Sequence, residues 1–192
     1  MTIKNFWSLN VDEAIVADKL RTEFGKDYEV FFPVNSQLKD IDLIVYNLKT
    51  QKSISIQVKA SKTHQGKKGT RKFGKPNSWS VINTSSIFNT TNKIDFIVFV
   101  IYDENLTNKN RNIIQHFLII PMKDFQKITK KDKKERKAGC YHYSFIVDEK
   151  QVLEINNTQD KTIDFSKYLN NWKLIKWILK NYTITLKGKE NP

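Results

Sequence analysis

Residues 39–61 read KDIDLIVYNLKTQKSISIQVKAS, and the second half of this stretch decides the fold around it. Polar and apolar residues alternate strictly over 53–61, which is typical of a strand with one buried face. Gln57 and Lys59 therefore point to the same side of that strand, while Val58 points into the core. The stretch predicts a half-buried strand that carries an amide and an amine on its polar face.

The first half of the same stretch predicts a partner for this strand. Residues 41–46 form a second apolar run, and the segment 47–52 is short, polar and turn-like. A hairpin of this kind would bring Asp42 across from the end of the strand that carries Gln57 and Lys59. Written out, the pattern is D-x14-Q-x-K.

These residue types in this arrangement point to phosphodiester hydrolysis. That reaction needs a cation to neutralise the phosphoryl oxygens and a positioned water to attack. Oxygen ligands suit Mg²⁺ or Mn²⁺. Asp42 would be the main ligand, with the side-chain oxygen of Gln57 and the carbonyl of Val58 as weaker ones, and Lys59 would hold the water. The alternative is an ordinary half-buried strand whose outer face carries Gln and Lys.

Residues 11–59 resemble the core of the PD-(D/E)XK superfamily, the restriction-endonuclease-like nucleases. The resemblance implies an α/β fold with a restriction-endonuclease-like core, in which a mixed β-sheet is flanked by helices. It matches Asp42 to the acidic residue of the motif and Gln57 with Lys59 to its (D/E)-x-K pair. It also implies a catalytic glutamate near the start of the first helix, where Glu13 stands.

The chain departs from that motif at two positions. Ile41 replaces the proline before the aspartate, and Gln57 replaces the acidic residue, as in the methyl-directed (Mrr-type) restriction enzymes. Three further segments resemble small uncharacterised bacterial members of the superfamily: IDFIVFVIYDE (94–104), HFLIIPMKDF (116–125) and NNWKLI (170–175).

Charge favours a nucleic-acid partner. The 192 residues contain 33 Lys and Arg against 20 Asp and Glu, a formal net charge of +13. The residues after the predicted catalytic strand are rich in positive charge and glycine, which predicts a loop that contacts phosphates. The candidate DNA-binding residues there are Lys62, His64, Lys67, Lys68, Arg71, Lys72 and Lys75. We expect Phe73 and Trp79 to pack onto the sheet rather than to stack on bases.

The remaining sequence predicts one domain over 1–192, with no membrane span and no secretory signal. A single cysteine, Cys140, excludes a disulfide framework and fits a reducing cytoplasm. Outside the hairpin, we predict helices over 11–24, 85–92 and 164–180, a basic helical stretch over 123–137, and strands over 28–33, 94–102, 113–120, 142–147 and 151–155.

Together these observations predict a cytoplasmic, Mg²⁺- or Mn²⁺-dependent endodeoxyribonuclease, most simply of the restriction type. Cutting both strands of DNA calls for two active sites, so we expect a homodimer. Two alternatives stay open. One is a catalytically inactive nucleic-acid-binding module with the same fold, and the other is a protein-interaction subunit of a defence system.

Overall fold

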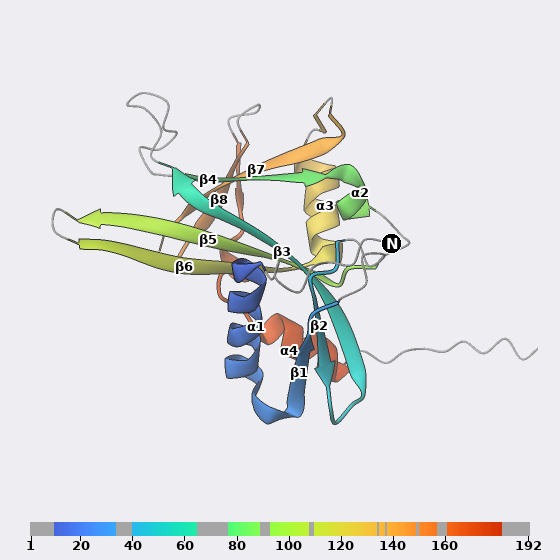
Figure 1. Ribbon diagram of the computed structural model, residues 1–192. Helices are drawn as coiled ribbons and strands as arrows, with labels where there is room; N and C mark the ends of the chain where they lie inside the picture. Colours follow the sequence, from blue (N-terminus) through green and yellow to red (C-terminus); the bar gives the residue numbers. More distant parts are fainter. Residues whose placement is uncertain are drawn as a thin grey trace, which may run out of the picture.

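The computed structural model describes residues 10–33, 40–64, 77–88, 93–107, 110–133, 135–136, 138–148, 150–156 and 161–181. Within these ranges the protein is a mixed α/β structure in which a large, mainly antiparallel sheet is flanked by helices (Figure 1). The mixed α/β prediction is therefore confirmed. No helix in these ranges is both long and apolar enough to cross a membrane.

The strands of the described residues are β1 (Tyr28–Phe31), β2 (Leu43–Asn47), β3 (Lys52–His64), β4 (Asn77–Asn83), β5 (Phe96–Thr107), β6 (Asn110–Pro121), β7 (Cys140–Val147), β8 (Val152–Asn156) and β9 (Lys161–Asp164). The α-helices are α1 (Val11–Phe24), α2 (Thr84–Phe88), α3 (Met122–Asp132) and α4 (Lys173–Asn181). Two short 3-10 helices, η2 (Gly25–Asp27) and η4 (Ser166–Tyr168), complete the set.

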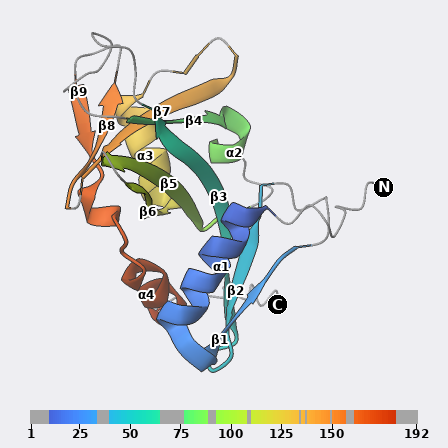
Figure 2. The same cartoon turned by 60° about the vertical axis from the view of Figure 1, so that its left-hand side comes forward.

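The long strand β3 joins two groups of strands. Its first part pairs with β2 and, in parallel, with β5, which brings β1 and β6 into the same layer. Its last residues pair with β4, which continues into β7, β8 and β9. Figure 2 shows β2 alongside the lower part of β3 and β4 near its upper end.

The two faces of the layer around β3 have different cores. On one face, Ile56 and Val58 pack against residues of α1 and α4. On the other face, Ile97 and Phe99 of β5 pack against residues of α2, α3 and β7. Residues 96–101 of β5 are fully buried, which confirms the prediction of a central strand covered on both sides.

A side-chain cap fixes the start of α1, and a glycine with positive φ follows its end. The side chain of Asn10 accepts a hydrogen bond from the Asp12 amide at 3.1 Å and so caps the first turn. Gly25 follows the last residue with a φ of 70°, a conformation that glycine adopts without steric cost. The predicted bounds of this helix are confirmed.

The helix predicted over 164–180 is partly wrong, because α4 starts only at Lys173. The preceding residues run along the free edge of β6 instead. Leu169 forms a bridge with Leu118, and Asn170, at a φ of 51°, accepts the Phe117 amide on its side chain at 3.0 Å. The end of β9, the short helix η4 and hydrogen bonds to β6 therefore take the place of the first part of the predicted helix.

Candidate functional site

Asp42 is held against the backbone of β3. β2 begins one residue later and runs antiparallel to β3 with Leu43 opposite Ile56, so the predicted hairpin is present. The Asp42 amide donates to the Ile56 carbonyl at 2.9 Å, and an Asp42 carboxylate oxygen accepts from the Val58 amide at 2.7 Å. The hairpin therefore fixes this carboxylate at the level of Gln57 and Val58.

One edge of β3 is uncovered at this point. β3 pairs with β2 as far as Ile56 and meets β4 at Ser61, whose hydroxyl lies 3.5 Å from that of Ser80, so along the described chain only β5 flanks residues 57–60. The N–H and C=O of one strand residue point to the same edge. Since the Val58 N–H faces Asp42, its carbonyl also points to the edge beside that carboxylate.

Gln57 is fully buried, and its side-chain oxygen has no hydrogen-bond partner in the described structure. The Nε2 group donates to a carboxylate oxygen of Asp40 at 3.2 Å. Because a carboxylate only accepts, Asp40 fixes which end of the amide carries the oxygen and turns Oε1 away from itself. A buried, unpaired acceptor is destabilising by about 1–3 kcal/mol, so it calls for an explanation.

Asp40 is a site residue that sequence reasoning missed. Its Oδ1 accepts from Gln57 and also from the hydroxyl of Ser86 on α2, at 3.0 Å. Its φ of 73° is uncommon for a residue other than glycine, and aspartate is among those that tolerate it. The available signal was the two-residue spacing of Asp40 and Asp42 in KDID, which places two carboxylates next to the same strand.

Lys59 lies on the same face of β3 as Gln57. In the parallel register, Gln57 pairs with Ile97 of β5 and Lys59 pairs with Phe99. Both of these β5 side chains belong to the core that α2 and α3 cover. Lys59 is half-buried. In the described part of the chain no carboxylate forms an ion pair with its ammonium group, which leaves that group available to a phosphate or a water molecule.

Glu13 is placed differently from the other predicted site residues. It belongs to α1, which packs on the face of Ile56 and Val58, whereas the Gln57 side chain points to the opposite face. Its neighbour Asp12 accepts a hydrogen bond from the Tyr102 hydroxyl of β5. The structure does not place Glu13 beside Gln57 and Lys59, and its catalytic role stays a prediction.

A second polar cluster continues along the face of Gln57 and Lys59. Thr63 donates to Asp103 of β5 at 2.9 Å, and His116 of β6 lies opposite Ile101, two residues before Asp103. Burial lowers the pKa of His116, although the charges of Asp103 and Asp148 act in the opposite direction. The imidazole is therefore neutral at pH 7.

Most of the predicted DNA-binding residues lie outside the described ranges. Lys62 is exposed near the end of β3. His64 is the last residue of that strand, where its backbone pairs with Asn77. The rest, outside the described residues, are Lys67, Lys68, Arg71, Lys72 and Lys75.

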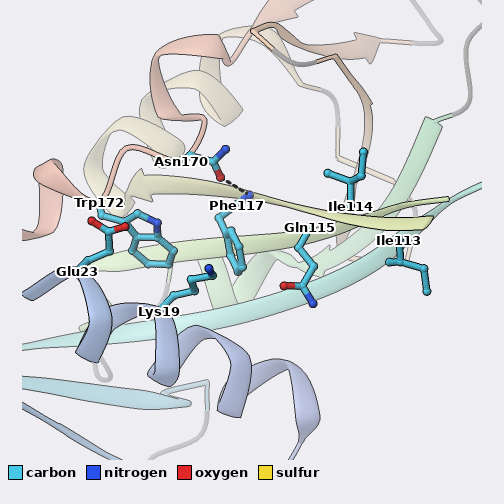
Figure 3. A pocket seen from close by; sticks show the side chains of 8 residues that line it. All are labelled: Lys19, Glu23, Ile113, Ile114, Gln115, Phe117, Asn170 and Trp172. Carbon is cyan, nitrogen blue, oxygen red and sulfur yellow. Dashed lines mark hydrogen bonds between the residues drawn. The ribbon is translucent and has the colours of Figure 1, made fainter. Parts of the chain in front are cut away.

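A groove of about 490 Å³ lies on the other face of the sheet, between α1 and β6. Figure 3 shows Lys19 and Glu23 of α1 facing Gln115 and Phe117 of β6 across it, with Trp172 at one end. None of the predicted catalytic residues lines this groove. It is a separate feature from the Asp42–Lys59 site.

The donor set of this hairpin is of the chemical type that suits a hard divalent cation. It comprises the Asp42 carboxylate, the unpaired Gln57 oxygen and the Val58 carbonyl, and all three are oxygen ligands of the kind Mg²⁺ prefers. Among the described residues, no three His, Cys, Asp or Glu side chains gather closely enough to hold a metal. A cation here would therefore depend on the amide and the backbone carbonyl as well as on carboxylate charge.

Comparison with known proteins identifies no relative. The sequence matches no family model and no curated protein, and the structure matches no solved structure.

Proposed function

We propose that this chain is a metal-dependent endonuclease that hydrolyses phosphodiester bonds of DNA. The single observation that carries the proposal is the buried side-chain oxygen of Gln57, which lacks a partner in the described structure and belongs to the strand that holds the Asp42 carboxylate. A divalent cation at this edge of β3 would satisfy the orphaned oxygen and balance the charge of Asp42.

Each residue of the site has a separate task in this proposal. Asp42, Gln57 and Val58 would hold Mg²⁺ or Mn²⁺ through oxygen atoms. The cation supplies Lewis-acid stabilisation of the phosphoryl charge when it is bound. Lys59 donates hydrogen bonds to the attacking water and to the phosphoryl oxygens. Hydrolysis transfers the hydroxyl of that water to phosphorus, and the leaving oxygen of the broken P–O bond takes up the proton.

The proposal is tested by incubating supercoiled plasmid with Mg²⁺, with Mn²⁺ or with chelator. We expect cleavage with either metal and none in chelator. Asp42→Ala should reduce cleavage to background, and Lys59→Ala should reduce it about 100- to 1,000-fold. Lys52→Ala is the matched control, since this lysine begins the same strand at its far end. Full cleavage in chelator would contradict the proposal.

A homodimer is part of the proposal, because double-strand cleavage needs two sites. One surface of the described chain supports pairing with a second copy. The Phe117 amide and carbonyl point to the edge of β6 that faces away from β5, and Asn170 binds both of them. By alternation, the backbone groups of Ile113 and Gln115 face the same edge, and Ile113 is 66% exposed.

The second candidate function is a DNA-binding module without catalysis. It is favoured by the glutamine in place of an acidic residue and by the lack, among described residues, of three clustered metal-ligating side chains. DNA binding that chelator and Asp42→Asn leave unchanged, without any cleavage, would support this function over the first.

A further inference from the structure

The exposed face of β4 carries a large aromatic side chain. Along this strand Ser78, Ser80 and Ile82 point inward, whereas Trp79 and Val81 point to solvent. The side chain of Trp79 is 59% exposed. The indole stands on the outer face of β4, where it contacts the His142 ring of the same sheet and stays largely exposed to solvent.

Two neighbours flank this indole. The His142 ring of β7 lies 5.4 Å from it between centroids, at an interplanar angle of 51°. On the other side is β3, which pairs with β4 from Thr63 opposite Ser78. The Ser61 and Ser80 hydroxyls, 3.5 Å apart, show that the two strands stay adjacent before this point. Lys62, which is exposed, is therefore the cross-strand neighbour of Trp79.

Three strands of this surface lack carboxylates at their described positions, whereas on the other side of Lys62 its β5 partner Tyr102 donates a hydrogen bond to the Asp12 carboxylate. We use "Trp79 face" for the surface formed by Lys62, Trp79, Val81 and His142. On β3, β4 and β7 the described positions that share its orientation contain no carboxylate; they are Ala60, Lys62, Asn77, Trp79, Val81, Asn83, Cys140, His142, Ser144 and Ile146. The whole chain carries a formal net charge of +13. A negatively charged partner with flat, apolar rings is complementary to this surface.

We propose that the Trp79 face binds single-stranded nucleic acid, with an unpaired base stacked on the indole and a neighbouring phosphate on Lys62. Aromatic side chains beside basic ones bind single strands in this way, because every base has a π-face and every linkage a negative charge. An exposed tryptophan on its own would not indicate nucleic-acid binding, because single apolar residues are common on protein surfaces. Here the paired ring, the adjacent cation and the absence of carboxylates at the positions above carry it together.

The Trp79 face lies next to the proposed nuclease site along β3, so it could guide a bound strand toward that site. Lys62 is three residues beyond Lys59, about 10 Å along β3, and it points to the opposite face. The uncovered edge of β3, at residues 57–60, ends just before Lys62. A strand bound on the Trp79 face would thus approach the Asp42–Lys59 site past this edge. The inference rests on the proposed function only for that role; binding itself needs no metal.

The test measures binding of a fluorescent thymidine 20-mer by anisotropy, in chelator and across a salt series. Trp79→Ala should weaken binding about 5- to 150-fold with an unchanged salt dependence, because stacking involves no charge. Lys62→Ala should instead lower the slope of log affinity against log salt by about 0.7. Trp177→Ala is the control, since this tryptophan on α4 is equally exposed, at 65%, and should bind like wild type.

A base-free oligonucleotide completes the design. The wild type and Trp79→Ala should bind an abasic backbone of the same length equally, because the difference between them lies in stacking. The proposal is overturned if Trp79→Ala binds the thymidine strand like wild type. It is also overturned if sedimentation shows a wild-type dimer that Trp79→Ala dissociates, which would make the face a self-association surface.

These experiments distinguish a loss of single-strand binding from a loss of cleavage. Asp42→Ala in chelator should bind the thymidine strand like wild type even though it does not cleave. Loss of cleavage without loss of single-strand binding concerns the nuclease site alone. Normal cleavage with no effect of Trp79→Ala on binding overturns only the present inference. Thermal unfolding of each variant shows that the exposed substitutions leave the fold intact.

Discussion

Asp40 and Gln57 form a hydrogen bond in which the buried amide nitrogen of Gln57 donates to a carboxylate oxygen 3.2 Å away. The bond fixes the orientation of the amide and leaves its oxygen without a partner among described residues. It joins the loop before β2 to the strand that carries Lys59. The orientation of the amide that we propose as a metal ligand therefore depends on a carboxylate that is not itself in the motif.

Replacing Asp40 with alanine should disturb the site without removing any proposed ligand. The Gln57 amide would lose its orienting partner and could rotate, so metal affinity should fall about 10- to 100-fold, as for other partners of metal ligands. Titration calorimetry with Mn²⁺ measures this. Ser86→Ala removes the other donor to Asp40 and should have a smaller effect. Equal Mn²⁺ affinities for wild type and Asp40→Ala would show that the Gln57 amide does not need Asp40 to orient it.

Gln57→Glu should make stability depend on metal. In chelator the new carboxylate would lie against Asp40 in a buried position, and two adjacent carboxylates repel. We expect a lower Tm than wild type in chelator and a larger rise in Tm on addition of Mg²⁺, because the cation neutralises the pair. Gln57→Met, which removes both polar atoms, should show no such rise. A Gln57→Glu variant that is insensitive to metal would contradict the proposed ligand role.

Lys133 and Glu154 form a buried ion pair that is independent of the candidate site. Lys133→Met alone should destabilise the protein by about 3–5 kcal/mol, because it leaves the Glu154 carboxylate buried without its cation. The double variant Lys133→Met, Glu154→Met should be close to wild type or more stable. Urea unfolding of wild type, Lys133→Met, Glu154→Met and the double variant at pH 7 gives the coupling energy. A double variant as unstable as the single one would contradict this account.

The Lys133→Met defect should also depend on pH. Burial raises the pKa of Glu154, and Lys133 opposes that shift. A carboxyl group with a raised pKa in the folded state stabilises that state at low pH and loses this contribution as pH rises through the folded value. Without Lys133 the pKa rises further. The variant should therefore be closest to wild type below about pH 4, near the unfolded pKa of glutamate, and furthest from it at neutral pH.

His116 should contribute to acid sensitivity. Burial lowers its pKa below the usual value, so the folded state favours the neutral ring. The stability that this confers is complete above the unfolded pKa of about 6.5 and decreases as pH falls through the folded value. The free energy of unfolding of His116→Gln, measured by urea titration, should fall less steeply than that of wild type as pH is lowered from about 6.5 to about 4. An unchanged slope would mean that the imidazole titrates alike in both states.

The open edge of β6 gives the homodimer a test of its own. Ile113→Lys places a charge beside the unpaired backbone groups, a change that opposes strand pairing between copies. If two copies associate through this edge, the variant should sediment as a monomer at concentrations where wild type is a dimer. Trp177→Lys, which adds the same charge to an exposed position on α4, is the control. A wild-type monomer at all concentrations would remove the homodimer from the proposal.

The sequence predicted β3 and its hairpin well because period-two alternation and a short polar turn both fix the register locally. β4 was not predicted, because its pattern is inverted: Ser78 and Ser80 point inward and Trp79 points to solvent. The inward serines face the region where β4 approaches Ser61 of β3, and small residues fit there. Hydrophobic alternation alone cannot show this, because it assumes that apolar residues mark the core.

The candidate site, like the fold, could be predicted only where it depends on local sequence pattern. Asp42, Gln57 and Lys59 follow from one hairpin, so local pattern was enough to bring the first two to one level. The contribution of Asp40 depends on a positive φ and on Ser86 from a helix more than 40 residues away in sequence. The position of Glu13 depends on which face α1 covers. Neither is a property of a single segment.

The central claim is that Asp42, Gln57 and Val58 together hold one divalent cation. Titration of the protein with Mn²⁺, followed by electron paramagnetic resonance of the free ion, measures this directly. We predict one bound Mn²⁺ per chain in wild type, none in Asp42→Ala and weakened binding in Gln57→Met. Stoichiometric binding that persists unchanged in Asp42→Ala, or no binding by wild type, would contradict it.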